Sequence, residues 1–198
     1  MELDWCFDTD LKNIEQHCWG LLHEGVKSYK NPFHYGVFAS VDDRFPSVRT
    51  VIVREVDIQQ KIICFNTDTR SPKFGQLSAN PHICWLFYDE NLRMQMRCMA
   101  SASLHVHDEL ADAVWKEARL NSKITYTAPH APGTPLDEPC LVDLNRDVIS
   151  DEELQEARRN FSVVHTRVIS LDWTFLHYKG NRRAFFDYQQ NRQTWMQS

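Results

Sequence analysis

R-T-V-I-V-R at residues 49–54 opens the most informative stretch of this chain, which continues through F-N-T-D-T-R-S-P-K at 65–73 to R-M-Q-M-R at 93–97. Apolar residues in these runs are interleaved with basic, hydroxyl or amide ones, which is typical of half-buried strands. Between the strands, Ser71-Pro72 supplies a helix cap followed by proline at the first helical position. Asn80-Pro81 ends that short helix. The stretch therefore predicts strands that carry polar side chains around one helix start.

The alternating pattern extends on both sides of this stretch. Strands are predicted at about 33–41, 47–57, 61–66, 82–89, 93–106, 161–171, 173–178 and 182–188. The connections between the first five are short and turn-like, apart from the helix after Ser71. Parallel neighbours would need a long crossover between each pair, so we expect an antiparallel meander.

Helices flank the predicted strands. One is expected at about 10–30, one at 108–122, and one from the capping box Ser150-x-x-Glu153 to about 159. Residues 126–140 hold four prolines and one glycine and are expected to form an ordered loop or lid. The sum is an α+β fold, a closed or nearly closed antiparallel β-barrel of about six strands with flanking helices. We expect one domain over 1–198, with the barrel at about 33–106 and 161–188.

Bulk composition argues against several classes of function. The 198 residues carry a formal net charge of −5 with a pI near 6.0, which does not suit a general nucleic-acid binder. No apolar run is long enough to span a membrane, and the acidic N-terminus lacks the pattern of a signal peptide. The six cysteines show no C-x-x-C pair, so free thiols are expected rather than disulfides. We expect a cytoplasmic protein in which any phosphate site is a local cluster of cations.

The start of the short helix is a candidate anion site. A helix N-terminus presents free backbone N–H groups and the positive end of the helix dipole. Thr67 and Ser71 add hydroxyl groups there, and Lys73 adds a full positive charge in the first turn. A cation in this position disfavours an isolated helix, whereas a bound anion would reverse that effect. The alternative is an ordinary capped helix at the surface.

Two further groups of polar residues lie on predicted strands. Arg49 and Arg54 are five residues apart, so on a regular strand they reach one ligand only through a bulge or a second subunit. The alternative is that each arginine solvates a strand end. Arg93, Gln95 and Arg97 alternate with apolar residues and form a polar row. That row needs solvent, a ligand or a subunit interface as its partner.

Two clusters lie outside this stretch. His105-x-His107-Asp108 could bind a metal, but no further ligands follow at a recognisable spacing, so solvated histidines and no metal site are expected. Basic residues outnumber acidic ones around 179–192, with Arg182 and Arg183 near the start of that segment. This segment is either a solvated hairpin or the wall of an anion pocket. The sequence has no Walker motif, G-x-S-x-G elbow or G-x-G-x-x-G loop.

Taken together, the order of these pieces resembles the pyridoxamine 5′-phosphate oxidase family of flavoproteins, the split-barrel FMN binders. The matching motifs are Arg49-x-x-x-x-Arg54, Phe65-Asn66-Thr67, Ser71-x-Lys73, Asn80-Pro81, Gln95-x-Arg97 and Gly180-Asn181-Arg182-Arg183-Ala184. The resemblance covers about 33–105 well and 161–188 loosely. It implies a split β-barrel with FMN bound noncovalently between the two subunits of a homodimer.

The resemblance also implies roles for single positions. Arg49, Ser71 and Lys73 would hold the phosphate region of FMN. The positions implied to line the ribityl chain and the ring are Thr50, Val51, Ile52, Asn66 and Thr67. Gln95 would contact the flavin, and Arg54 would lie near flavin or substrate. Arg182 and Arg183 are the candidates for holding an anionic substrate. A second subunit would also resolve the opposite facing of Arg49 and Arg54.

The chain departs from the family pattern where the substrate would bind. Pro72 replaces a second basic residue, His177 stands near the position of a tryptophan against the flavin, and the terminal R-L-x-P is absent. The resemblance therefore implies an FMN-dependent oxidoreductase of a divergent branch, acting on an unidentified small substrate. The alternatives are a true pyridoxamine or pyridoxine 5′-phosphate oxidase and a non-catalytic split-barrel protein that binds flavin or haem. No catalytic acid–base residue is assigned.

Overall fold

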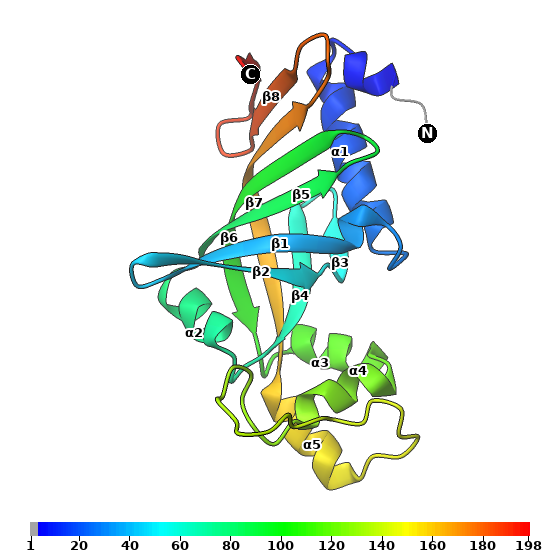
Figure 1. Ribbon diagram of the computed structural model, residues 1–198, viewed down its shortest axis with the longest axis vertical. Helices are drawn as coiled ribbons and strands as arrows, with labels where there is room; N and C mark the ends of the chain where they lie inside the picture. Colours follow the sequence, from blue (N-terminus) through cyan, green and yellow to red (C-terminus); the bar gives the residue numbers. More distant parts are fainter. Residues whose placement is uncertain (1–3) are drawn as a thin grey trace.

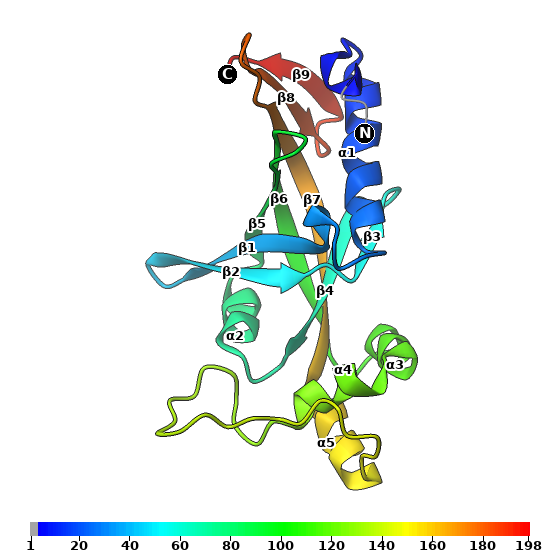
Figure 2. The ribbon, with the colours of Figure 1, turned by 45° about the vertical axis from the view of Figure 1, so that its right-hand side comes forward.

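The computed structural model describes residues 4–198, which form a nine-stranded antiparallel sheet with helices around it (Figures 1 and 2). The strands are β1 (Tyr35–Asp42), β2 (Phe45–Ile52), β3 (Glu55–Asp57), β4 (Ile62–Asp68), β5 (His82–Asp89), β6 (Met94–His105), β7 (Phe161–Phe175), β8 (Arg182–Asp187) and β9 (Arg192–Met196). Seven follow the order β2-β1-β5-β6-β7-β4-β3, while β8 pairs with β7 and β9 with β8. The predicted antiparallel α+β fold is confirmed, with nine strands in place of about six.

The helices begin close to the predicted positions, but two of them, at the expected ranges 10–30 and 108–122, are shorter than expected. They are α1 (Leu11–Gly25), α2 (Pro72–Ala79), α3 (Glu109–Glu117), α4 (Leu120–Ile124) and α5 (Asp151–Asn160), with short 3₁₀ turns η1 (Asp4–Phe7), η2 (Pro32–His34) and η3 (Thr125–Thr127). Ser71 and Asn80 bound α2, and the capping box of Ser150 and Glu153 is present at α5. Helix α1 ends at Gly25 rather than near residue 30, and Gly25 lies against the backbone of Phe33, where a Cβ would come within 2.7 Å.

Three predicted elements are divided differently. The helix expected at 108–122 is broken where Ala118 and Arg119 adopt extended backbone angles. The strand expected at 47–57 is interrupted at Val53-Arg54, where the backbone N–H groups donate to His34 and Cys64. Conversely, the strands expected at 161–171 and 173–178 are the single strand β7, because Asp172 stays in register with Arg97 of β6. Local sequence does not reveal these cross-strand partners.

The barrel is open along one seam. Strand β2 stands at one end of the hydrogen-bonded order and β3 at the other, although the chain runs directly from β2 into β3. The outer edge of β2 therefore has no strand neighbour among the described residues. The β1–β2 hairpin projects from the barrel to one side, and α2 lies close beneath it (Figures 1 and 2). An unpaired edge of this kind presents free backbone donors and acceptors.

An aromatic cluster fills the barrel. The side chains of Phe38, Phe65, Trp85 and Phe87 are fully buried or nearly so. The centroids of neighbouring rings in this cluster are 4.9–5.7 Å apart. The Trp85 indole N–H donates to Thr166 Oγ1 at 2.9 Å, and that hydroxyl donates to the carbonyl of Ile63 at 2.6 Å. The core therefore contains a satisfied polar pair within an apolar cluster.

The lower part of the molecule is a helical layer on the end of β7. Helices α3 to α5 gather there, and the segment 128–149 runs past them and past α2 without regular structure (Figures 1 and 2). Gly133 of this segment lies against the Pro72 ring, where a Cβ would stand 3.5 Å from Cγ. The loop expected at 126–140 is thus present, after the η3 turn.

Two further expectations concern cysteines and membrane spans. All six cysteines are free, and Cys6, Cys18, Cys64 and Cys98 are buried. Within residues 4–198, no helix combines the length and the apolar character that crossing a bilayer requires.

Candidate functional site

Two cations meet between the β1–β2 hairpin and the start of α2. From β2, the Arg49 guanidinium donates to Ser40 Oγ at 2.6 Å, to Ser47 Oγ and to Gln76 Oε1 at 3.0 Å. From the first turn of α2, Lys73 Nζ donates to Thr67 Oγ1 at 3.0 Å. We call Arg49, Thr67, Ser71 and Lys73 the cationic cluster.

The charges of the cationic cluster are not neutralised by the protein. Burial lowers the pKa of Lys73, and the nearby Arg49 lowers it further, although Asp68 acts in the opposite direction. Burial also lowers the pKa of Arg49, against the attraction of Asp42. Neither cation forms an ion pair with a carboxylate of the described residues. Partly buried cations that repel one another favour a bound anion.

Ser71 adds a hydroxyl that does not cap its own helix. It occupies the N-cap position of α2, but its Oγ donates to the Asp68 carbonyl at 2.7 Å and lies 3.2 Å from Thr67 Oγ1. The Asp68 carboxylate is held by Arg70 at 2.8 Å, so it does not pair with Lys73. The backbone N–H groups in the first turn of α2 therefore receive no capping hydrogen bond from the Ser71 side chain.

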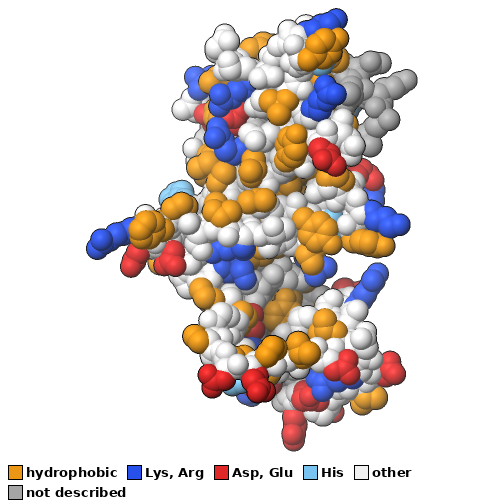
Figure 3. All heavy atoms as spheres, in the orientation of Figure 1, with side chains coloured by type: hydrophobic (Ala, Val, Ile, Leu, Met, Phe, Trp, Pro, Cys, Tyr) orange, Lys and Arg blue, Asp and Glu red, His pale blue; other side chains and the backbone are white. Residues whose placement is uncertain are grey.

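Arg54 and Asn66 lie at a neighbouring cavity of about 190 Å³, bounded also by Trp115, Tyr126 and Phe161. The three aromatic rings are 5.1–6.1 Å apart. Asn66 Oδ1 is buried without a hydrogen-bond partner among the described residues. A larger open groove of about 850 Å³ adjoins this cavity, where the surface is hollowed between the barrel and α3 (Figure 3). Because an unpaired buried acceptor is costly, the Asn66 side-chain oxygen favours a hydrogen bond from a donor group of a bound molecule.

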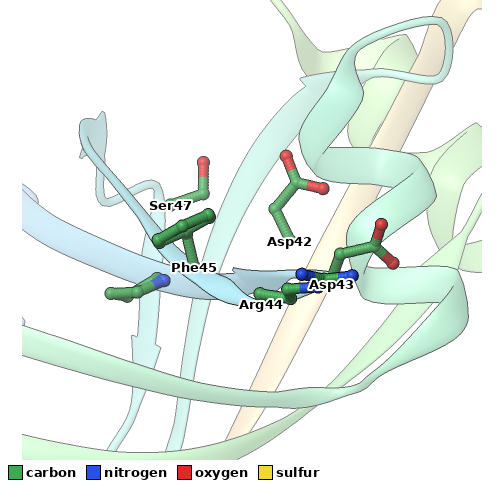
Figure 4. A pocket seen from close by; sticks show the side chains of 6 residues that line it. Asp42, Asp43, Arg44, Phe45 and Ser47 are labelled. Atoms are coloured by element: carbon green, nitrogen blue, oxygen red, sulfur yellow. The ribbon is translucent and has the colours of Figure 1, made fainter.

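A second pocket of about 550 Å³ lies at the tip of the β1–β2 hairpin, lined by residues 42–47 (Figure 4). Asp42 at this tip accepts a hydrogen bond from Gln76 Nε2 of α2 at 3.0 Å. Gln76 also accepts from Arg49 and Ser40, so one amide connects the hairpin tip to the cationic cluster. Phe45 is 74% exposed. Sequence reasoning missed Ser40, Ser47 and Gln76, whose relevance depends on the pairing of β1 with β2 and α2.

Gln95 and Arg97 lie elsewhere on the barrel. Their side of β6 faces Asp172 of β7, which accepts from Arg97 at 2.5 Å and from Arg183 of β8 at 2.6 and 2.9 Å. Arg93 is not part of this row, because it has a positive φ of 49° in the turn before β6. No described hydrogen bond joins this row to the cationic cluster. Asp172 was not anticipated, since it falls between two strands predicted separately.

Arg182 and Arg183 differ in their surroundings. The Arg182 guanidinium donates to the carbonyls of Cys6 at 2.5 Å and Asp8 at 2.7 Å, and it stacks 4.6 Å from the centroid of the Trp195 ring. Arg183 instead forms the ion pair with Asp172 on the outer face. The structure therefore uses Arg182 to hold η1 against the C-terminal hairpin, and the two arginines are not brought together at one pocket.

We expect Asp172→Asn to lower the free energy of unfolding by roughly 1–3 kcal/mol near neutral pH, because the charge-assisted hydrogen bonds from Arg97 and Arg183 weaken. Burial alone would raise the pKa of Asp172, but bonds from Arg183 and Arg97 outweigh it and hold the pKa below 3.8. Because the pKa of Asp172 is lower in the folded protein, its charge stabilises the fold at pH values above 3.8. This stabilisation is lost as the pH falls through the pKa of the folded protein.

Urea unfolding over a pH series measures this effect. The difference between wild type and Asp172→Asn should be constant above the usual carboxyl range and should shrink below it. Asp187→Asn is the matched control, because Asp187 accepts only backbone N–H groups of its turn. A difference that stayed the same at acidic pH would show that the charge of Asp172 is not what stabilises the fold.

Sequence comparisons agree with this geometry. The family model described as pyridoxamine 5′-phosphate oxidase, FMN-binding domain, matches residues 16–106. A pyridoxine/pyridoxamine 5′-phosphate oxidase of Bradyrhizobium diazoefficiens is 32% identical over 106 residues, or 51% of this chain and 48% of that protein. One of Gluconobacter oxydans is 35% identical over 77 residues, or 38% of each. The chain thus matches about half, or less, of the length of these relatives.

Solved structures share the fold at low sequence identity. An FMN-binding protein of Nostoc punctiforme, related to pyridoxamine 5′-phosphate oxidase, superposes with a TM-score of 0.68 at 20% identity, covering 91% of this chain and 95% of the other. PhzG of Burkholderia lata, solved with tetrahydrophenazine-1-carboxylic acid, gives 0.68 at 14% identity, covering 96% and 95%. Residues 16–106 of this chain are thus similar to the FMN-binding domain of pyridoxamine 5′-phosphate oxidases, and the chain shares the fold of these solved structures.

Proposed function

We propose that this protein binds FMN noncovalently and is an oxidoreductase for a small substrate. The observation that carries the proposal is the cationic cluster, in which Arg49 and Lys73 lie near a helix N-terminus without a carboxylate partner among the described residues. A phosphate group would supply that negative charge. The unpaired Asn66 side-chain oxygen also supports the proposal, because a flavin ring carries an N–H group that could donate a hydrogen bond to it.

The residues divide into two proposed roles. Arg49, Ser71 and Lys73 hold the phosphate, and Thr67 keeps Lys73 in place through its hydroxyl. Thr50, Val51 and Ile52 offer the free edge of β2 to the ribityl chain and the ring, with Asn66 opposite on β4. When bound, FMN supplies the hydride and electron chemistry, while the protein supplies position and electrostatics. Arg54 lies at the mouth of the aromatic cavity, where it would orient a substrate.

The proposal includes a homodimer with flavin at its interface. Gln95 shares no described contact with the cationic cluster, so a second copy is the proposed source of the Gln95 that reaches the flavin. Apolar side chains around the same sheet support an interface, since Tyr35, Val48, Tyr88 and Met99 are all more than 40% exposed. Large exposed apolar residues gathered on one sheet are typical of protein contacts.

The absorption spectrum of the purified protein tests the cofactor, with the released molecule identified by mass. We expect a flavin spectrum, one FMN per chain, and a higher melting temperature after FMN is added to stripped protein. Colourless protein that neither binds FMN nor is stabilised by it would contradict the proposal. Turnover of pyridoxamine 5′-phosphate, followed by pyridoxal phosphate and peroxide, then separates a true oxidase of that substrate from other activities. Tight FMN binding without any turnover would indicate a flavin carrier.

A further inference from the structure

A separate cavity of about 440 Å³ lies on the outer face of the sheet, where β6, β7, β4 and β3 are neighbours. The sheet register explains its composition, because Ser103 pairs with His165, His165 with Cys64, and Cys64 with Glu55. These side chains form one row across four strands. We call this space the outer-face cavity. No residue assigned above to FMN lines it.

A hydrogen-bond chain connects two side chains that line the cavity, Ser103 and His105, to Asp108, which does not line it. Ser103 Oγ lies 3.2 Å from His105 Nε2, and His105 Nδ1 lies 2.8 Å from Asp108 Oδ2. An ionised carboxylate can only accept, so the Nδ1 atom carries the proton. In the neutral ring, Nε2 is then an acceptor for the Ser103 hydroxyl, whose alternative acceptor, the His165 carbonyl, is farther away at 3.5 Å. Nucleophile, base and orienting carboxylate are thereby connected in the order that activates a serine.

The carboxylate of this chain is itself held in position. Asp108 is the N-cap of α3, and its other oxygen accepts from Ala111 N–H at 2.9 Å. That backbone hydrogen bond is the largest cause that lowers the pKa of Asp108, and His105 adds to it. The His105 ring also packs against His165, with ring centroids 4.9 Å apart. Helix capping therefore fixes the carboxylate and ring packing fixes the base, as positioning of a catalytic group requires.

We propose that the outer-face cavity is a second reactive site, in which Ser103 is acylated by small carboxylic esters. Ser103 Oγ attacks the ester carbonyl, and its proton moves to His105 Nε2. The new Oγ–acyl bond forms as the bond to the leaving alcohol oxygen breaks, and that oxygen takes the proton from His105. Water then attacks the acyl-serine with His105 as base, and releases the acid. Ester and water are the only reactants, so no redox partner is required.

The charge of the cavity wall defines the class of ester. Glu55 and Asp57 contribute two carboxylates, and Arg167 is the one Lys or Arg among the described residues that line it. Arg167 Nη1 donates to the Gln60 carbonyl at 3.1 Å, and its other N–H groups can donate to the oxygen that becomes negative during attack. The excess of carboxylates disfavours an anionic ester. The site therefore suits neutral or cationic esters of small size.

Acylation by p-nitrophenyl acetate tests the proposal on the purified, full-length protein. Peptide mass mapping should place one acetyl group on Ser103, and nitrophenolate release should show an initial burst. Ser103→Ala should remove both. His105→Ala should slow the burst by about 100-fold or more, since general bases contribute about 10²–10⁴-fold. Asp108→Asn should also slow it while keeping α3, because asparagine is an equally good N-cap.

Ser101→Ala is the matched control, because Ser101 lies two residues earlier on β6 and, among the described residues, makes no hydrogen bond to a histidine, although it pairs with His82 in the register of β5 and β6. It should leave the burst unchanged. Equal acetylation of Ser101 and Ser103 would overturn the proposal by showing that Ser103 is not selectively activated. A normal burst in Ser103→Ala would also overturn it, since another group, such as an imidazole, would then attack the ester. FMN-loaded and FMN-stripped protein should react at the same rate, so the result does not depend on the cofactor proposal.

Discussion

Replacing Arg49 and Lys73 together by methionine is expected to weaken FMN binding by about 100-fold or more. A hydrogen bond to a charged group contributes about 1.5–3 kcal/mol, and about 1.4 kcal/mol corresponds to a tenfold change in affinity. Two lost phosphate contacts therefore amount to roughly 100-fold at the least. The dissociation constant, measured by quenching of flavin fluorescence, checks this expectation.

The same substitutions should act differently on the cofactor-free protein. Lys73 has a lowered pKa because it is buried beside Arg49, so its charged form opposes folding at neutral pH. Lys73→Met alone should therefore leave the melting temperature of the FMN-free protein unchanged or raise it, while reducing the further rise that FMN produces. A fall in the FMN-free melting temperature would mean that Lys73 serves mainly as a structural partner of Thr67.

Arg44→Met is the control for charge. Arg44 lies in the hairpin-tip pocket on the same β1–β2 hairpin, rather than in the cationic cluster (Figure 4). The Arg44→Met substitution removes one positive charge from the same region, so a purely long-range electrostatic effect would reduce the FMN affinity of this variant too. An affinity close to that of wild type is expected. Equal weakening in Arg44→Met and in Lys73→Met would argue against a phosphate seat at the start of α2.

Trp85→Ala is expected to lower the free energy of unfolding by about 3–5 kcal/mol, the range for removing a large buried aromatic side chain. Trp85 is fully buried and contacts the rings of Phe38, Phe65 and Phe87. Its loss leaves a cavity at the centre of the barrel and deprives Thr166 Oγ1 of its donor. Such a loss is a large fraction of the stability of an ordinary domain.

Equilibrium unfolding in urea measures this effect, with an unchanged denaturant dependence as evidence that the same surface is exposed on unfolding. Trp195→Ala is the matched control, since Trp195 lies on β9 and is 39% exposed. The control should lose much less stability than Trp85→Ala. Similar losses in both variants would show that the aromatic cluster is not the centre of the core.

Local chemistry in the sequence predicted the elements that depend on neighbours along the chain. Ser71, Pro72 and Asn80 stand at the ends of α2, and Ser150 with Glu153 caps the start of α5, because helix ends depend on residues only a few positions apart. The period-two runs likewise predicted most strands and their antiparallel pairing. Asp172 shows the limit of this reasoning. An acid inside an apolar run reads locally as a strand break, whereas its partners Arg97 and Arg183 lie on neighbouring strands.

By itself, then, the sequence determined the caps, the alternation and the order of motifs that carries the family resemblance, all of which are local or ordered along the chain. Only the tertiary structure decided that Arg54 lies between β2 and β3, that Gln76 bonds to Arg49, and that Arg182 donates to the carbonyls of Cys6 and Asp8. It also decided that Ser103, His105 and His165 share one cavity. The physical reason is register, because cross-strand contacts depend on which residues are placed opposite one another, and no short window of sequence contains both partners.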